Sequence, residues 1–485
     1  MVQKIEKSDW VFLVFCLILG ILAEEAFFRG QIGISYLVFI LAFYAVLFYR
    51  SKSFVFSHQR LGYLILCCIW LLSASYVLND SMLFYVLNIL FIPALVIFHL
   101  VLVTGPKNLK WNQLSFMALI FSRILNAIKY DVSFTKQIGK GFKGDVDHQK
   151  FIVGKKIALG VVIAFPLMLV VMRLLMMADT QFELLIGGIP NWFNMLDGEV
   201  VFRSVVIFLF TIAFFGFLQV LFKKQVTVLK QSEVTVIKLD SIITITVLII
   251  MNVVYVLFTV VQFKYFFGGS LDQDFTYAEY ARKGFFELLF VTIINLSITV
   301  MVLWLGKQED GFLKRLTQTL LTLIVVSSAV MLCSAFIRLS LYEDAYGYTL
   351  TRVLAHSFMI FLGLIFMYTL VKIWMEKLSL FHFYFVASLV YYTSICMIDL
   401  NRIVVKENIK RYQVTEKIDL HYLNSLSYTG VLGLMDLYEE DQYIDGLSTI
   451  LKERKQEAMV ETYPWQSFNL KREQAFEKLK ELNLD

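Results

Sequence analysis

The chain has 485 residues, of which 58% are hydrophobic, 16% aromatic and 17% charged. The net charge is only +5 and the basic residues are dispersed over separate loops, so the composition excludes a nucleic-acid-binding surface. All five cysteines lie inside apolar stretches, where thiols usually act as small hydrophobic groups. We therefore predict no disulfide framework, no metal site and no cofactor.

About eleven apolar stretches of membrane-spanning length follow one another along the chain. Each holds the ~20 mostly apolar residues that cross ~30 Å of hydrocarbon as a helix. Their unbroken apolar runs exclude the alternating pattern of a membrane β-barrel. The sequence therefore predicts an all-α, polytopic membrane bundle with a small helical C-terminal segment outside the membrane. The predicted spans are 10–28, 32–49, 62–78, 82–104, 157–178, 202–222, 240–263, 284–305, 316–337, 352–374 and 381–399.

The loops between these spans alternate between lysine-rich and lysine-poor. Because positive charge is retained in the cytoplasm, the pattern predicts an N-terminus inside and, after eleven spans, a tail outside. We predict a multi-pass protein of the cytoplasmic membrane. Its regions are spans one to four over 1–104, a basic cytoplasmic segment over 105–156, spans five to eleven over 157–399, and a helical extracytoplasmic tail over 400–485.

Two segments outside the spans are predicted to be amphipathic. From Trp111 to Tyr130 the pattern is helical, which favours an interfacial helix whose lysines face anionic lipid headgroups of the inner leaflet. In the tail, we expect helices over 416–438, 445–460 and 466–482, with an interruption near Pro464.

Ionisable residues inside spans cost about 2.5–3.5 kcal/mol at mid-helix, so each one raises a question of function. For Arg173 and Glu287, a water-filled outer cavity and a buried ion pair remain open alternatives. Three others are expected to be helix-end residues that extend toward water: Lys264, Arg338 and Asp399. The intramembrane polar candidates are Glu24, Glu25, Arg173 and His356.

Two outer loops, 265–288 and 341–352, are dense in aromatic and charged residues. Tyrosine beside arginine and glutamate either anchors an interface or binds a polar headgroup or sugar. Because the loops flank spans eight to ten, we predict that they form one ligand site at the outer face. Its candidate residues are Tyr277, Glu279, Tyr280, Arg282, Glu287, Glu343, Tyr346 and Arg352.

Three strings in this half of the chain resemble a known family. They are Tyr265-Phe-Phe-Gly-Gly, Tyr277-Ala-Glu-Tyr-Ala-Arg-Lys-Gly-Phe-Phe-Glu-Leu and Tyr342-Glu-Asp-Ala-Tyr-Gly-Tyr-Thr. The tail segments Asn408-Ile-Lys-Arg411 and Asp419-Leu-His-Tyr422 extend the likeness. They resemble the bacterial membrane family catalogued as domain of unknown function 4173, related to the 4153 group. The resemblance implies a bacterial membrane location and candidate residues, and it implies no mechanism.

A sharper motif lies in span one, where Glu24-Glu25-Ala-Phe-Phe-Arg29 resembles the Glu-Glu-x-x-x-Arg signature of intramembrane proteases. Such enzymes use a glutamate to activate water and need histidines at the same depth. The candidate histidines, His58 and His99, are predicted near the opposite face. We therefore expect Glu25 to pair with Arg29 one turn away, and Glu24 to face Arg173.

The sequence favours a non-enzymatic role: binding, sensing or translocating a small polar or amphiphilic ligand at the outer face. The alternatives are an outward-facing enzyme acting on lipid-linked envelope substrates and the intramembrane protease. An enzyme should bring two titratable groups within hydrogen-bond reach, and His356 has no evident partner in the sequence. Expected partners are the lipid bilayer, anionic headgroups on the inner face, and a membrane-protein partner or a second copy of the chain.

Overall fold

In the computed structural model, residues 7–52, 54–107, 111–141, 198–222, 239–267, 285–306 and 311–484 are described. Over these residues the chain is helical, and the only ladder contact is an isolated bridge between Leu239 and Gly306. Nine described helices are long and apolar enough to cross a membrane, and Ile34–Arg50 is a shorter apolar helix. Each predicted span except 157–178, which lies outside the described residues, coincides with a helix. The total of about eleven spans stays a prediction.

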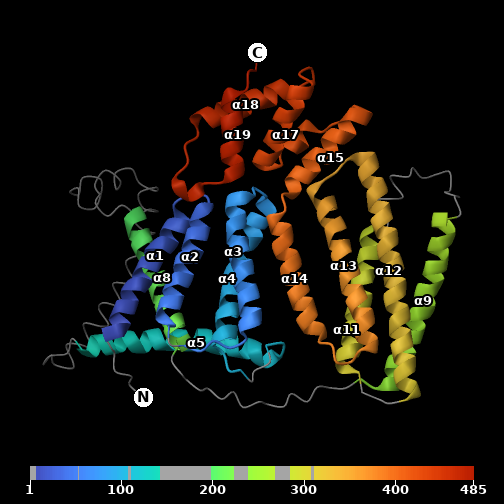
Figure 1. The fold of residues 1–485 in the computed structure, drawn as a ribbon, viewed down its shortest axis with the longest axis horizontal. Helices are drawn as coiled ribbons and strands as arrows, with labels where there is room; N and C mark the ends of the chain where they lie inside the picture. The colour runs from blue at the N-terminus through green and yellow to red at the C-terminus, as the bar shows by residue number, and fades with distance from the viewer. Residues whose placement is uncertain are drawn as a thin grey trace, which may run out of the picture. The chain divides into compact units, whose positions relative to one another are not determined.

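The described helices fall into two compact units. The first contains α1 (Lys7–Phe28), α2 (Ile34–Arg50), α5 (Leu114–Gly141) and α8 (Gly198–Phe222). In this unit α5 runs across the ends of α1 and α8 (Figure 1). Phe134 of α5 packs on Trp10 at the start of α1 and on Phe215 of α8, with ring centroids 6.2 and 4.6 Å apart. A helix therefore occupies the segment expected to be interfacial, and its place at a membrane surface stays a prediction.

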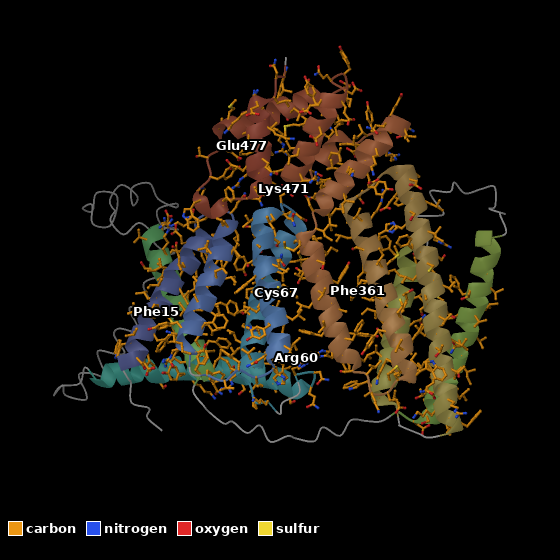
Figure 2. The ribbon with its side chains drawn as sticks, in the orientation of Figure 1. Phe15, Arg60, Cys67, Phe361, Lys471 and Glu477 are labelled. Carbon is orange, nitrogen blue, oxygen red and sulfur yellow. The ribbon has the colours of Figure 1, made fainter. Side chains whose placement is uncertain are left out.

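The second unit holds α3 (Gln59–Leu78) and most of α4 (Met82–Thr104). Its other long helices are α9 (Ser241–Phe267), α11 (Phe285–Leu305), α12 (Phe312–Tyr346), α13 (Leu350–Trp374) and α14 (Leu380–Met397). One apolar core joins α9, α11, α12 and α13, with Leu248, Ile324 and Ala335 fully buried. Phe361 lies on α13, whereas Lys471 and Glu477 lie on the C-terminal tail (Figure 2).

The tail forms five helices with a small core of their own: α15 (Leu400–Thr415), α16 (Leu420–Asn424), α17 (Ser427–Glu440), α18 (Leu447–Val460) and α19 (Leu470–Glu481). Val404, Leu434 and Leu451 are completely buried in that core. The expected single helix over 416–438 is wrong. Glu416 takes a left-handed conformation (φ 54°) that ends α15, and Asp419 then caps α16 by accepting a hydrogen bond from the Tyr422 N–H.

Candidate functional site

A stripe of polar residues runs down the buried face of α11. Thr292, Asn295 and Thr299 recur at three- and four-residue spacing, which places them on one face of the helix, and all three are buried. The two threonine hydroxyls donate to carbonyl oxygens of their own helix, at 2.7 and 2.9 Å. Because both hydroxyls are satisfied within α11, Asn295 is the residue of the stripe that reaches a neighbouring helix.

Amide side chains link α11 and α9 to α12. Asn295 Nδ2 donates to Ser328 Oγ over 2.8 Å, and Asn252 Nδ2 donates to the carbonyl oxygens of Leu248 and Leu320 over 2.8 and 3.1 Å. The side-chain oxygens of Asn252 and Asn295 accept no hydrogen bond from the described residues. Buried polar atoms without a partner are rare, so these two oxygens mark the α9–α11–α12 interface as a candidate site.

A cavity of about 350 Å³ lies in the same three-helix interface. This volume is in the range of small-ligand sites, which are mainly apolar with a few placed polar groups. Two charged residues of opposite sign line it, Glu287 in the first turn of α11 and Arg338 of α12. The remaining wall is formed by Val254, Tyr255, Phe258, Leu288, Val291 and Met331. The cavity therefore offers both an anionic and a cationic group beside an apolar surface.

Arg338 does not lie at a helix end, so that expectation was wrong. The predicted span stops at residue 337, whereas α12 continues to Tyr346, and Arg338 is only 6% exposed. At 1.5 Å per residue, the 35 residues of α12 extend about 52 Å, well beyond a ~30 Å hydrocarbon layer. The apolar pattern ended at residue 337, but helical geometry continued, because Leu339 and Ala335 keep that face buried.

The connection between α12 and α13 brings several predicted site residues together. The Arg352 guanidinium lies over the Tyr342 ring, 4.1 Å from its centroid, and also donates to the Gly347 carbonyl. The Tyr342 and Tyr346 rings are 4.9 Å apart. Arg352 and Tyr346 therefore both pack against the same tyrosine.

His356 has a partner that the sequence analysis missed. Its Nε2 lies 2.9 Å from Oε2 of Glu343, a carboxylate that is 4% exposed. The imidazole also packs edge-on against Phe336, with ring centroids 4.4 Å apart. Glu343 and His356 belong to two different helices, so no periodic pattern within either helix indicates the pair.

Tail residues hold the same connection in place. Asn408 of α15 forms two hydrogen bonds with the backbone of Tyr348, accepting from its N–H at 3.1 Å and donating to its carbonyl at 2.8 Å. Arg411 donates to the carbonyls of Asp344 and Ala345, and the Tyr422 hydroxyl accepts from the Leu350 N–H. The tail residues that carry the family resemblance therefore fix a loop that also carries it.

The α3–α4 connection is fixed by the tail in a similar way. Asp80 accepts hydrogen bonds from the Thr429 N–H at 2.7 Å and the Thr429 hydroxyl at 3.1 Å. Asn469 donates to the carbonyls of Tyr76 and Asn79. Burial raises the pKa of Asp80, and the Thr429 hydrogen bonds act in the opposite direction. Asp399, expected to extend toward water, instead caps α15 and pairs with Lys471 at 2.7 Å.

In the first unit, the two glutamates of the protease-like motif are held by arginines. Glu25 pairs with Arg29 at 2.9 Å, as expected. The buried Glu24 has an arginine partner that was not anticipated, Arg203 of α8, at 3.4 Å. Its expected partner Arg173 lies outside the described residues. Among the residues that the structure describes, no group of three or more His, Cys, Asp or Glu is arranged to hold a metal.

His58 is separated from these glutamates along the helices of the first unit. The end of α2 lies at the start of α1, because Arg50 Nη2 is 3.4 Å from Asp9 Oδ1. Glu24 is fifteen residues further along α1, which is about 22 Å of helix. Since His58 follows the end of α2, this geometry gives no support to a catalytic Glu–His arrangement.

A second buried polar group lies near that end of α1. Gln219 of α8 donates to Asp9 at 2.8 Å, and Arg50 approaches both side chains. Nearby, the Asp131 carboxylate of α5 fills the space beside Gly216, so a side chain at Gly216 would overlap it. Burial raises the pKa of Asp131 to about 7.

The predicted outer site is thus described only in part. Tyr277, Glu279, Tyr280 and Arg282 lie outside the described residues, and so does the side chain of Lys264. Glu287 lines the α9–α11–α12 cavity, while Glu343, Tyr346 and Arg352 lie in the α12–α13 connection. Whether the two loops form one site stays a prediction.

The nine long apolar helices found among the described residues indicate an integral, multi-pass membrane protein. Residues 66–437, more than half of the chain, match the family described as Domain of unknown function (DUF4153). The chain belongs to this family, the group to which the sequence resemblance pointed as a relation; the closer likeness to domain 4173 stays a prediction. Neither the curated proteins nor the solved structures contain a match.

Proposed function

We propose that the protein binds an amphiphilic ligand in the outer half of the bilayer, in the cavity between α9, α11 and α12. The observation that supports this proposal is that Glu287 and Arg338 both line one otherwise apolar cavity of about 350 Å³. Arg338 would hold an anionic group and Glu287 a cationic group, while Tyr255 and Phe258 would cover the apolar part. The ligand class that fits is a zwitterionic amphiphile.

The amides below the cavity support movement of polar groups along the same interface. Asn295 lies eight residues from Glu287 along α11, about 12 Å, and its free side-chain oxygen faces the buried interface. Asn252 supplies a second such oxygen. We infer that the polar contacts continue from the cavity toward the middle of the bundle, as a translocating or sensing protein requires.

The proposal can be tested by binding of a fluorescent lysophosphatidylethanolamine to the purified protein in nanodiscs. Arg338→Gln and Glu287→Gln should each weaken binding at least tenfold, about 1.4 kcal/mol. Arg315→Gln, which removes an exposed charge from the first turn of the same helix, is the matched control and should bind like the wild type. Unchanged affinity in both cavity variants, with folding confirmed by thermal unfolding, would contradict the proposal.

The orientation is part of this proposal: N-terminus in the cytoplasm, α5 at the inner surface against anionic lipid, tail on the outside of a bacterial cell membrane. It is supported by the alternation of lysine-rich and lysine-poor loops. A single reactive cysteine tests it, with Glu477→Cys placed on the exposed face of α19 and the exposed Cys67 and Cys333 changed to serine. An impermeant maleimide should label intact cells. Labelling only in inverted vesicles would mean that the span count is wrong by one.

One observation favours a second candidate, an outward-facing enzyme acting on lipid-linked envelope substrates. Glu343 Oε2 and His356 Nε2 lie 2.9 Å apart, which is the separation of a general base and its orienting carboxylate, although their angles are not those of a hydrogen bond. Hydrolysis of a polyprenyl diphosphate by the reconstituted protein would support this role if His356→Gln abolished it. Absence of turnover by the wild type would count against it.

A further inference from the structure

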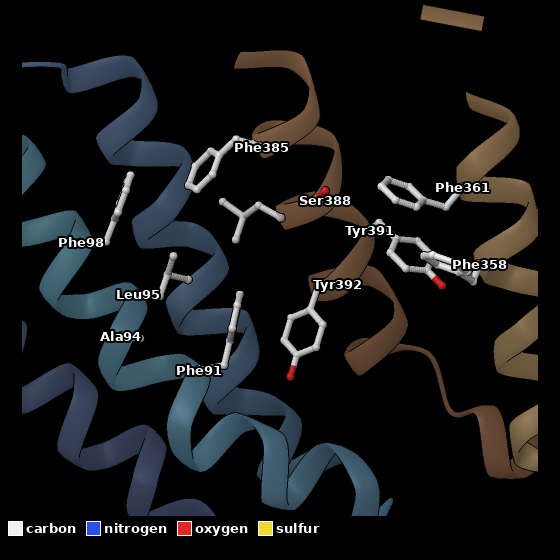
Figure 3. Close-up of a pocket in the computed structure, with 11 residues that line it drawn as sticks. Phe91, Ala94, Leu95, Phe98, Phe358, Phe361, Phe385, Ser388, Tyr391 and Tyr392 are labelled. Carbon is white, nitrogen blue, oxygen red and sulfur yellow. The ribbon is translucent and has the colours of Figure 1, made fainter. Parts of the chain in front are cut away.

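A second cavity, a groove of about 520 Å³, lies between α4, α13 and α14. It shares no lining residue with the α9–α11–α12 cavity. Figure 3 shows rings from all three helices around it. Its wall includes Phe91, Ala94 and Phe98 of α4, Phe358 and Phe361 of α13, and Phe385 of α14. No lining residue described for this groove carries a formal charge.

Two pairs of aromatic rings hold α4 and α14 apart along the groove. Phe91 packs on Tyr392 with centroids 4.4 Å apart, and Phe98 packs on Phe385 with centroids 5.1 Å apart. Phe91 and Phe98 are seven residues apart, about 10 Å along the helix. Between them lies Ala94, whose methyl group leaves the intervening space open. The groove therefore has a built shape, with two ring pairs as supports.

Both tyrosine hydroxyls of the wall have hydrogen-bond partners inside the protein. The Tyr391 hydroxyl lies 2.9 Å from Ser357 Oγ, and the Tyr392 hydroxyl donates to Asn88 Oδ1 over 2.8 Å. The Tyr391 ring is stacked on Phe361 with centroids 4.5 Å apart, so these tyrosines contribute rings and no free hydroxyl to the groove. Since the three helices are candidate membrane spans, an occupant needs no hydrogen bonds and must be apolar.

One end of the groove has the composition of a membrane–water interface. Trp111 packs on Phe385 and Phe98, with ring centroids 5.0 and 6.4 Å apart, and the His382 ring lies 5.4 Å from the Trp111 ring. Indole rings are enriched at headgroup level, and imidazole, like indole, combines an apolar body with a polar tip. A chain in the groove could therefore carry its polar head at this end.

From these contacts we propose that the groove is a site for one hydrocarbon chain of a membrane lipid, inserted between α4 and α14 with its headgroup beside Trp111 and His382. The site retains that lipid specifically, in contrast to lipids that merely surround the bundle. The occupant is an acyl chain of a phospholipid, the lipid class that surrounds the three candidate spans.

Native mass spectrometry of the purified, full-length protein tests this proposal. Delipidated protein is exposed to vesicles of phosphatidylglycerol with a small fraction of polyprenyl phosphate, washed in mild detergent and weighed. The wild type should retain one phosphatidylglycerol per chain, identified by its mass, and retention of polyprenyl phosphate instead would overturn the proposal. Ala94→Phe places a ring between the two supports and should lower retention at least tenfold.

Two further variants keep the test decisive. Ser388→Phe fills the groove from α14 and should have the same effect, so it decides the matter if Ala94→Phe fails to fold. Ala213→Phe adds a ring to an exposed position of α8 and should retain lipid like the wild type. Equal retention by the wild type and both filled variants would overturn the proposal.

Discussion

The two cavities of the second unit lie between membrane-spanning helices but are built from different contacts. The α9–α11–α12 cavity has Glu287 and Arg338 in its wall, with the amide of Asn295 bonded to Ser328 in the same interface. The α4–α13–α14 groove is lined by rings, and its tyrosine hydroxyls are bonded within the protein. The comparison shows that volume does not distinguish a polar-ligand site from a lipid-chain site. What distinguishes them is whether the polar groups of the wall face the cavity or are already hydrogen-bonded within the protein.

The bilayer explains why such different contacts can both hold helices together. Lipid tails are as apolar as leucine, so burial of apolar surface supplies little driving force between spans. Packing of rings and interhelical hydrogen bonds must provide it. If this account is correct, exchanging the kind of contact at either cavity should have a predictable cost.

The largest effect is expected from a charge placed in the aromatic groove. Leu95 lines it and is 6% exposed, and Leu95→Glu would put a carboxylate among rings without a cationic partner in the described wall. Insertion scales place the cost of such a charge at about 3 kcal/mol. We expect a severalfold lower yield of folded protein by fluorescence-detected size exclusion. Leu95→Met, which keeps volume and polarity, is the control, and equal yields for Glu and Met would contradict the comparison.

The partly buried carboxylate of Asp131 allows the cost of burying a charge to be measured by varying the pH. Because the pKa of Asp131 is raised from 3.8 to about 7, the folded state binds more protons than the unfolded state between these values. Its contribution to the free energy of unfolding therefore falls as pH rises from about 4 to 7. The full difference corresponds to about 4 kcal/mol, and solvent screening around this half-buried group reduces it to about 1–2 kcal/mol.

Asp131→Asn removes the titration and keeps the shape of the side chain beside Gly216. The variant should unfold at a higher temperature than the wild type at pH 8 and at a similar temperature at pH 4. Thermal unfolding in detergent across this range measures the difference. A constant gap between the two proteins at every pH would show that Asp131 does not titrate as proposed.

Much of the helical architecture could be predicted from the sequence, because apolar runs of about 20 residues have few alternatives in a bilayer. The Glu25–Arg29 pair was predictable for a related reason, since residues four apart share a helix face. The length of α12 was not, because its last turns, from Arg338 to Tyr346, are no longer apolar throughout. Hydropathy predicts which residues lie in the membrane. The ends of a helix are instead determined by its capping residues and tertiary contacts.

The site was predictable only where its residues were already unusual for their surroundings. Glu287, Glu343 and His356 drew attention as ionisable groups near spans. Glu343 and His356 pair across two helices, and Glu287 shares a cavity with Arg338 of another helix, so neither arrangement has a periodic signature. Asn295 was missed because a single amide in an apolar run is no anomaly. The aromatic groove was missed for a similar reason, since rings such as Phe91 resemble any lipid-facing residue in the sequence.

Removal of one aromatic support should have a moderate effect. Phe98→Leu breaks the stack on Phe385, and an aromatic pair contributes about 0.5–1.5 kcal/mol beyond its buried area. We expect a lower thermal unfolding temperature together with weaker lipid retention. Phe290→Leu, at a position of α11 that is 67% exposed, is the matched control and should change neither. Loss of stability without loss of lipid would separate the support from the site.

The smallest effect is expected from the hydrogen bond between Asn295 and Ser328 in the α9–α11–α12 interface. A double-mutant cycle over Asn295→Ala and Ser328→Ala isolates their 2.8 Å hydrogen bond, because Ser328 also donates to the Ile324 carbonyl and keeps that bond in the Asn295 variant. Interhelical hydrogen bonds in membranes average about 0.6 kcal/mol, since the separated helices also find partners. We expect a coupling of that size from unfolding in mixed micelles. A coupling near zero would mean that packing alone joins α11 to α12. The amide at position 295 would then be needed for its side-chain oxygen, which has no partner among the described residues, and not for its hydrogen bond to Ser328.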